Sequence, residues 1–84
     1  MIVTFETCPG YYEQEEDGRK NNTVRKIDSE DPRFKWMADG LVDHIQIVSS
    51  GNPEYNFRRD ITDISFWEDI VIITWKHNNS QINL

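Results

Sequence analysis

The chain turns from a helix into a strand within the stretch Gly18-Arg19-Lys20-Asn21-Asn22-Thr23-Val24-Arg25. Gly18 predicts the end of the helix, because glycine readily adopts the left-handed backbone conformation that lets a helix stop and the chain reverse. Side chains alternate between two faces along a strand. The stretch therefore predicts that Thr23 and Arg25 share one face of a sheet, while Val24 lies on the other.

Three side chains of this stretch form a predicted polar corner, which consists of Lys20, Thr23 and Arg25. The turn from helix to strand brings an amine, a hydroxyl and a guanidinium to one region, and these donors suit an anionic or carbonyl-bearing ligand. The alternative is a corner whose charged groups are only solvated. Spacing alone favours that alternative, so a binding site needs further support.

The composition predicts one cytoplasmic domain. A chain of 84 residues without internal repeats suits a single domain, which we place at residues 1–76, followed by a polar tail at 77–84. The longest apolar run, at residues 70–73, is far too short to cross a membrane, so we expect no membrane partner. The first residues do not have the pattern of a signal peptide. The single cysteine, Cys8, excludes an internal disulfide and fits a reducing compartment.

Acidic residues outnumber basic ones, and the formal net charge is −6. Because contacts of Lys and Arg with phosphates supply most of the non-specific affinity for nucleic acids, we expect no binding to duplex DNA. The basic residues are nevertheless concentrated, since Arg19, Lys20, Arg25 and Lys26 lie close together. The acidic run at residues 13–17 precedes them. We expect this run to form a solvated helix face; its alternative role is to restrict what the basic corner binds.

Hydrophobic patterning predicts a small α+β barrel of about five strands with one or two short helices. The expected strands are residues 2–5, 22–27, 43–48, 55–66 and 70–75, and the expected helices are residues 11–17 and 32–39. Apolar positions change face near Thr62-Asp63, which predicts a bulge or bend of the kind that curls a sheet. The last strand is apolar at consecutive positions, so we expect it to be central and buried on both faces.

The pattern Gly-x-Lys-x-x-Thr-x-Arg at residues 18–25, preceded by a short helix with Tyr11 and Tyr12, resembles the signature of ASCH domains. These domains are small relatives of the PUA RNA-binding barrel. The later segments ITDIS and IITW resemble the closing strands of that family, and the likeness extends over roughly residues 2–76. The chain is similar above all to the small ASCH-like proteins of phages and prophages. The resemblance implies a PUA-like β-barrel.

The resemblance also implies a ligand site at the polar corner. It would consist of Gly18, Arg19, Lys20, Thr23 and Arg25 and would bind a nucleoside, a nucleotide or an RNA base. The alternative function is that of a small acidic phage-type protein that binds a host or defence protein. The intact motif favours the first function, whereas the negative charge favours the second.

Some ASCH proteins are amidohydrolases that remove the acetyl group of N(4)-acetylcytidine with a lysine, a threonine and a glutamate. Lys20 and Thr23 match the first two by their spacing, and a neutral lysine would take the threonine proton so that the hydroxyl attacks the amide carbonyl. Glu68 is the glutamate in the corresponding part of the chain, where it would activate water. The segment around it is shortened to residues 67–69, and acidic neighbours favour a charged lysine. Binding without catalysis is therefore the stronger expectation.

The remaining candidate residues predict neither a metal site nor a cofactor. His44 and His77 are isolated and lack the spacing of metal ligands. Two tryptophans near the end of the chain, Trp67 and Trp75, are expected in the core rather than in a base-stacking platform. Cys8 is likewise expected to be a small buried residue.

Two adjacent arginines, Arg58 and Arg59, must lie on opposite faces of their strand. One side chain is expected to face water, and the other to lie beside Tyr55 and Phe57 or to pair with Asp60. Surface solvation is the expectation, and cation–π packing is the alternative.

Overall fold

The computed structural model describes residues 1–77, so all but the first residue of the predicted tail at 77–84 lies outside the described residues. Residues 1–77 form five strands and two short helices. They are β1 (Ile2–Thr7), α1 (Pro9–Glu16), β2 (Asn22–Lys26), α2 (Pro32–Ala38), β3 (His44–Ser49), β4 (Asn56–Trp67) and β5 (Ile70–Trp75). Every predicted element is present, and its ends differ from the expected ones by at most two residues.

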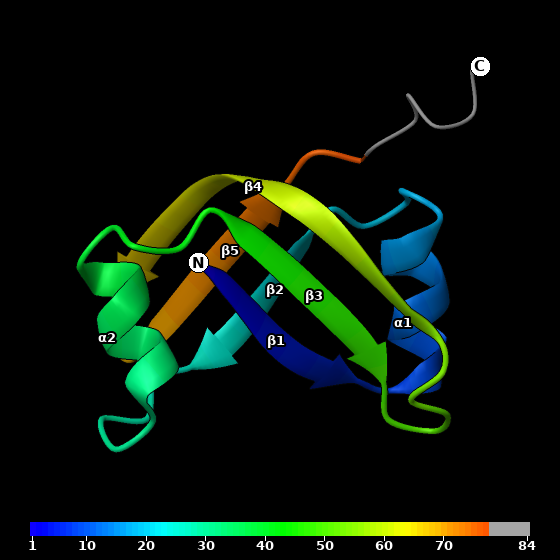
Figure 1. Cartoon of the computed structure of the whole chain (residues 1–84), viewed down its shortest axis with the longest axis horizontal. Coiled ribbons are helices and arrows are strands. Elements are labelled where there is room, and N and C mark those ends of the chain that lie inside the picture. The colour runs from blue at the N-terminus through cyan, green and yellow to red at the C-terminus, as the bar shows by residue number, and fades with distance from the viewer. Residues whose placement is uncertain (78–84) are drawn as a thin grey trace.

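The five strands form one curled sheet in the order β1-β3-β4-β5-β2 (Figure 1). β1 runs parallel to β3, and all other neighbours are antiparallel. The long strand β4 belongs to both halves of the sheet, because its first part pairs with β3 and its second part with β5. The register shifts between Ile61 and Asp63, which confirms the predicted bulge near Thr62-Asp63. This irregularity lets one strand turn from one half of the sheet into the other.

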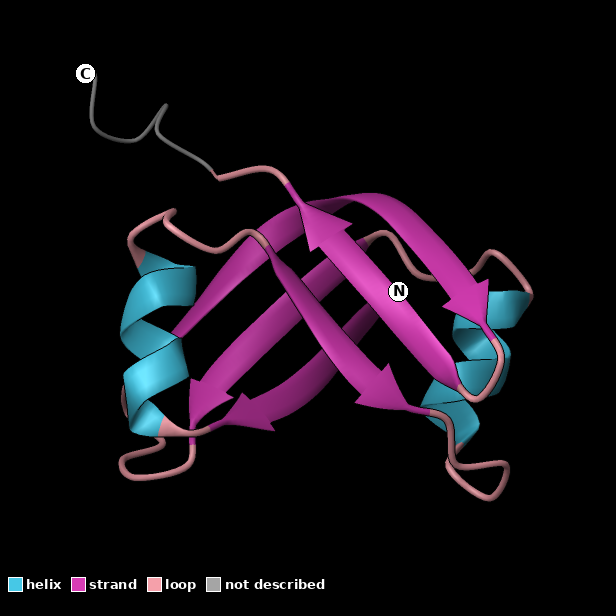
Figure 2. Ribbon diagram, turned by 180° about the vertical axis from the view of Figure 1, so that it is seen from behind, coloured by secondary structure: helices cyan, strands magenta, loops and turns pink. Residues whose placement is uncertain are grey.

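The curled sheet is a half-barrel, with β1 and β2 as its two edges. Within residues 1–77 no strand pairing joins these two edges, so the sheet stays open between them. The two helices lie at opposite ends of the half-barrel (Figure 2). The predicted class, a small α+β fold of about five strands with two short helices, is confirmed. None of the helices within residues 1–77 is long and apolar enough to span a membrane.

The end of α1 explains why residue 18 is a glycine. Gly18 has a φ of +93°, in the left-handed region that ordinary side chains rarely adopt, and the chain reverses there into β2. A Cβ at this position would also lie 2.9 Å from the ring of His77. The predicted helix stop is therefore correct, and the reversal places the start of β2 beside α1.

The core occupies the inner face of the half-barrel. It contains residues from four strands, from α2 and from the connection between α2 and β3, namely Val3, Phe5, Phe34, Met37, Val42, Ile45, Ile47, Phe57, Val71, Ile73 and Trp75. β5 lies between β4 and β2, as expected for an interior strand. Its burial alternates, however, because Ile70, Ile72 and Thr74 lie on the outer face and are only half-buried. The prediction that β5 is buried on both faces was wrong, since no helix within residues 1–77 covers that outer face.

Two expected core residues are exposed. Cys8 lies at the start of α1, where its thiol is exposed instead of buried. Trp67 is 67% exposed because it ends β4 beside a tight turn, whereas Trp75 is buried as predicted. The prediction for Trp67 was wrong because apolar character alone does not show on which face a residue lies.

Arg59 is buried, contrary to the expectation of solvation, while Arg58 is exposed as expected. The Arg59 guanidinium lies 4.5 Å from the centre of the Phe57 ring, so the cation–π alternative holds for this residue. It also donates a hydrogen bond of 3.0 Å to the backbone oxygen of Glu16 at the end of α1. Burial lowers the pKa of Arg59, opposed in part by the carboxylate of Glu16. This arginine ties the end of α1 to β4.

Candidate functional site

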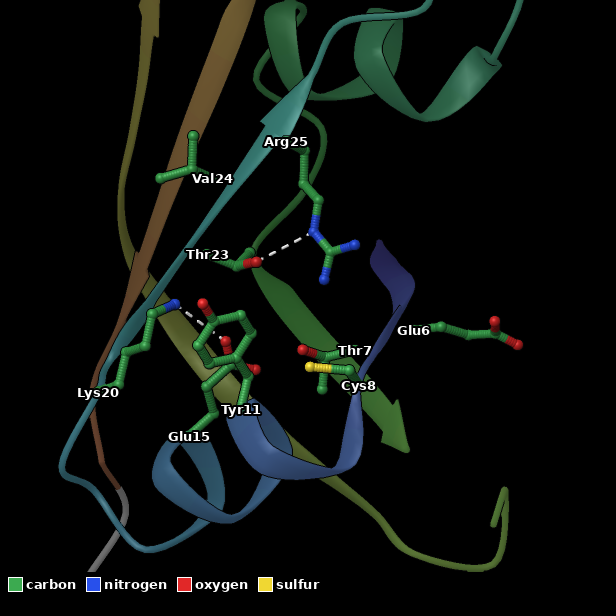
Figure 3. Close-up of a pocket in the computed structure, with 9 residues that line it drawn as sticks. All are labelled: Glu6, Thr7, Cys8, Tyr11, Glu15, Lys20, Thr23, Val24 and Arg25. Carbon is green, nitrogen blue, oxygen red and sulfur yellow. Dashed lines mark hydrogen bonds and ion pairs between the residues drawn. The ribbon is translucent and has the colours of Figure 1, made fainter. Parts of the chain in front are cut away.

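A pocket of about 430 Å³ lies between the open edges of the sheet, beside α1 (Figure 3). β1 and the residue after it contribute Glu6, Thr7 and Cys8 to its wall, α1 contributes Tyr11 and Glu15, and the opposite wall is formed by residue 20 and residues 23–25. The pocket occupies the side on which the half-barrel fails to close. It is a direct consequence of the unpaired edges of β1 and β2.

The edge of β2 presents backbone groups to this space. Trp75 N donates to Asn21 O at 3.0 Å, and Ile27 N donates to Asp69 O at 2.7 Å, so these positions of the chain face β5. Because backbone groups alternate in direction along an antiparallel strand, Thr23 and Arg25 also bond to β5, while the N–H and C=O of Val24 point away from it. The wall of the pocket therefore offers a main-chain donor and acceptor in addition to side chains.

Lys20 and Glu15 form an ion pair at the side of the pocket near α1. Lys20 Nζ lies 3.0 Å from Glu15 Oε2 and donates a second hydrogen bond of 2.7 Å to Asn22 O. The Glu15 side chain is only 1% exposed, and its Oε1 has no hydrogen-bond partner within residues 1–77. Lys20 Nζ is also 5.7 Å from the centre of the Tyr11 ring. The ammonium is thus held in place by a carboxylate, a carbonyl and an aromatic ring.

Arg25 lies across the pocket from this pair. Its Nε donates to Thr23 Oγ1 at 3.0 Å, and its guanidinium carbon is 5.0 Å from the centre of the Phe5 ring on β1. Its two terminal nitrogens have no hydrogen-bond acceptor within residues 1–77, and the guanidinium points from β2 toward β1 (Figure 3). Burial lowers the pKa of Arg25, while the carboxylate of Glu15 acts in the opposite direction. The free end of the guanidinium is suited to a planar acceptor.

The structure brings together three of the five residues predicted to bind a ligand. Lys20, Thr23 and Arg25 all line the pocket. Arg19 does not, because it turns back onto Asp17, with an Arg19 Nη to Asp17 carboxylate distance of 2.9 Å. Gly18 lies in the turn before β2 and contributes the reversal of the chain rather than a contact with the pocket.

Glu68 is not among the residues that line the pocket. It lies exposed in the tight turn between β4 and β5, where it has a φ of 51°. β5 begins at Ile70, which pairs with Lys26 at the far end of β2 from Lys20. The turn that carries Glu68 therefore lies at the other end of the strand, and Glu15 is the carboxylate that meets the predicted lysine.

Sequence reasoning missed Glu15 as a pocket residue, because the acidic run was expected to be solvated. Its neighbours Glu13 and Glu16 are exposed as expected. The available signal was its spacing from the aromatic residues, since Glu15 follows Tyr11 by four positions and therefore shares a helix face with it.

Charges in the pocket are balanced, because the two cations Lys20 and Arg25 are matched by Glu6 and Glu15. Such a pocket offers both donors and acceptors without a strong field of one sign. Among residues 1–77 no group of three or more His, Cys, Asp or Glu side chains is arranged to hold a metal ion. The residues that line the pocket can bind a ligand through hydrogen bonds and through contact with an aromatic ring.

No protein-family model matches this chain, and a search of curated proteins found no match either. The functional assignment therefore depends on the pocket itself.

Proposed function

We propose that this protein binds a nucleoside, a nucleotide or an RNA base in the pocket between β1 and β2. The observation that carries the proposal is the free guanidinium end of Arg25, which faces a pocket with an exposed aromatic ring on its other side. Tyr11 is 56% exposed, so its ring is accessible for stacking. A planar base combines a face that stacks on an aromatic ring with edge atoms that accept hydrogen bonds from arginine.

The same pocket supports the proposal that the chain is an ASCH-like protein of the cytoplasm, related to the small phage and prophage members. The motif residues Lys20, Thr23 and Arg25 share one pocket, which is what a common binding corner requires. The curled five-stranded sheet is compatible with a PUA-like barrel. Under this proposal the motif retains its binding role and the shortened segment around Glu68 has no part in it.

Binding without catalysis is the form of the function that the geometry favours. Lys20 donates to Glu15 and to Asn22 O, and Thr23 accepts from Arg25. Within residues 1–77 no hydrogen bond joins Lys20 to Thr23, although a lysine base must reach the hydroxyl that it activates. The Lys20 side chain is instead held by the Glu15 carboxylate, at 3.0 Å from Oε2.

A titration by calorimetry tests the proposal. The wild-type chain, Arg25→Met and Lys20→Ala are each titrated with cytidine nucleotides, nucleosides and short RNAs at two salt concentrations. Arg25→Met should weaken binding by about tenfold or more, because it removes charge-assisted donors from the pocket. Glu13→Gln is the matched control, since Glu13 is exposed on the same helix and does not line the pocket. Negligible heats for the wild type with every ligand would contradict the proposal.

A second candidate function, the binding of a host or defence protein, is favoured by the outer face of the sheet. Val24 is 53% exposed and Trp67 is 67% exposed. On that face Val24 pairs in register with Ile72 of β5, and Trp67 pairs with Ile70 of the same strand. Exposed apolar side chains that lie together are typical of interaction surfaces. The two functions are separable, because Trp67→Ser changes the outer face and should leave nucleoside affinity unchanged.

A further inference from the structure

One oxygen of the Glu15 carboxylate is buried without a partner. Oε2 accepts from Lys20, but Oε1 has no hydrogen bond within residues 1–77 although the side chain is 1% exposed. Buried acceptors are almost always satisfied in folded proteins, and Glu15 is one of the residues that line the pocket, so Oε1 calls for a donor from outside the chain. Because Oε1 itself is closed off from the pocket surface, the Glu15 side chain must turn toward the pocket to meet that donor. A hydroxyl or an N–H group of a ligand is such a donor.

Glu15 lies close to the place where a base stacked on Tyr11 would bind. Tyr11 and Glu15 are four residues apart on α1, and both surround Lys20 Nζ, at 5.7 Å from the Tyr11 ring centre and 3.0 Å from Glu15 Oε2. Figure 3 shows the Tyr11 ring and the Glu15 carboxylate on the same side of the pocket. A planar group that stacks on this ring therefore lies on the same side of the pocket as the carboxylate.

The opposite side of the pocket offers hydrogen-bond donors, which are the terminal nitrogens of Arg25. The terminal nitrogens of Arg25 are donors without an acceptor within residues 1–77, so they are free to donate to a ligand there. A ligand that carries both a carbonyl and an N–H group has the acceptor that suits Arg25 and the donor that suits Glu15. The edges of uracil and guanine carry this combination.

A phosphate adds little to such a complex. Arg25 and Lys20 are the cations of the pocket, but Lys20 is already paired with Glu15, and Glu6 lies on the β1 wall. A phosphate that approaches Arg25 therefore also approaches carboxylates, which repel it.

We propose that the pocket selects a neutral nucleobase edge, with a base N–H donating to Glu15 and a base carbonyl accepting from Arg25, and that the phosphate is not a recognition element. This inference rests on the proposed function, because it specifies which feature of a nucleoside the same pocket reads.

Paired ligands test the inference on the intact chain by calorimetry. Uridine is compared with 3-methyluridine, and guanosine with 1-methylguanosine, because each methyl group replaces the N–H next to a carbonyl. In the wild type, methylation should weaken the binding of the better nucleoside by about tenfold or more, since it leaves the buried carboxylate oxygen without a donor. The 5′-monophosphate of that nucleoside should bind within about threefold of the nucleoside itself, because a charge-balanced pocket gains little from an added anion.

Variants of the chain test whether Glu15 accepts the hydrogen bond from the base N–H. The double variant Glu15→Met/Lys20→Met removes both members of the ion pair and so avoids an unpaired buried charge. It should bind the methylated and unmethylated nucleosides equally, while Glu13→Gln should discriminate between them as the wild type does. Circular dichroism shows whether the double variant is folded, and the wild-type comparison decides the inference if it is not.

The outcomes separate this inference from the function on which it rests. Equal affinity of the wild type for methylated and unmethylated nucleosides would overturn the inference and leave the binding function standing. A monophosphate that binds more than about tenfold tighter than its nucleoside would do the same, as would discrimination that persists in the double variant. No binding of any nucleoside or nucleotide would overturn both.

Discussion

Lys20 Nζ lies 3.0 Å from the carboxylate of Glu15, whose side chain is 1% exposed although it belongs to a run of acidic residues. This pair joins the end of α1 to the start of β2. Because Lys20 also donates to Asn22 O, the ammonium holds the helix, the turn and the edge strand together. The pair therefore contributes to stability as well as to the pocket.

Lys20→Met should destabilise the fold, because it leaves the buried carboxylate of Glu15 without its counter-ion. We expect a loss of about 3 kcal/mol, the lower end of the range for breaking a buried pair, since Lys20 itself remains 31% exposed. Urea unfolding followed by tryptophan fluorescence measures it. Lys26→Met is the control, because Lys26 pairs with Asp69 at the surface and should cost less than about 1 kcal/mol. Equal losses for the two variants would refute this role of the pair.

Ile73→Ala should cost about 2–5 kcal/mol, because Ile73 is fully buried in the core between β4 and β2. Ile72→Ala should cost clearly less, since Ile72 lies on the half-buried outer face of β5. Both values come from the same urea unfolding experiment, which makes each variant the control of the other. A larger loss for Ile72→Ala would mean that something covers the outer face of the sheet in solution.

The fold was more predictable from the sequence than the site. Alternation along residues 22–27 and the change of face near Thr62-Asp63 are local patterns, and they predicted β2 and the bulge of β4 correctly. The burial of Glu15 and Arg59 was not predictable in this way, because it depends on where α1 lies against β4. Likewise, the openness of the sheet depends on the separation of β1 and β2, which are edges only because of the strand order.

Arg59→Met should reduce the protection of the α1 amides from hydrogen exchange more than Arg58→Met does. Arg59 donates to the backbone oxygen of Glu16 and stacks on Phe57, whereas the adjacent Arg58 is exposed on the opposite face. Native-state hydrogen exchange should show faster exchange of the α1 amides in Arg59→Met than in the wild type or in Arg58→Met. Unchanged protection of these amides would show that the guanidinium is not what anchors the helix.

Acid should destabilise the protein partly through Asp43. Hydrogen bonds from His44 and from the N-terminal ammonium lower the pKa of Asp43 from 3.8 to about 2. A lowered folded-state pKa stabilises the folded state at pH values above the unfolded-state pKa, and that stabilisation is lost as the pH falls toward the folded-state value. The stability of the wild type should thus fall more steeply than that of Asp43→Asn between pH 3.8 and about 2, as measured by urea unfolding across this window. Glu54→Gln, which has no ion pair within residues 1–77, should follow the wild type.

The last prediction concerns the amidohydrolase chemistry that the ASCH resemblance implies. We expect the wild type to release no acetate from N(4)-acetylcytidine above the uncatalysed rate. Thr23 is 3% exposed and accepts a hydrogen bond from Arg25 instead of donating one to Lys20, and Glu68 lies in a turn outside the pocket. Acetate release is followed for the wild type, Thr23→Val and Glu68→Gln.

If the wild type does release acetate, the variants show how. Loss of activity in Thr23→Val with full activity in Glu68→Gln would keep a threonine nucleophile and move the carboxylate role to Glu15, which lines the pocket and pairs with Lys20. A fall of roughly 10²–10⁴-fold in Glu68→Gln, the usual size of a general acid–base contribution, would instead require the turn to approach the pocket when substrate binds. Nucleoside binding without acetate release in all three proteins is the result that the pairing of Lys20 with Glu15 predicts.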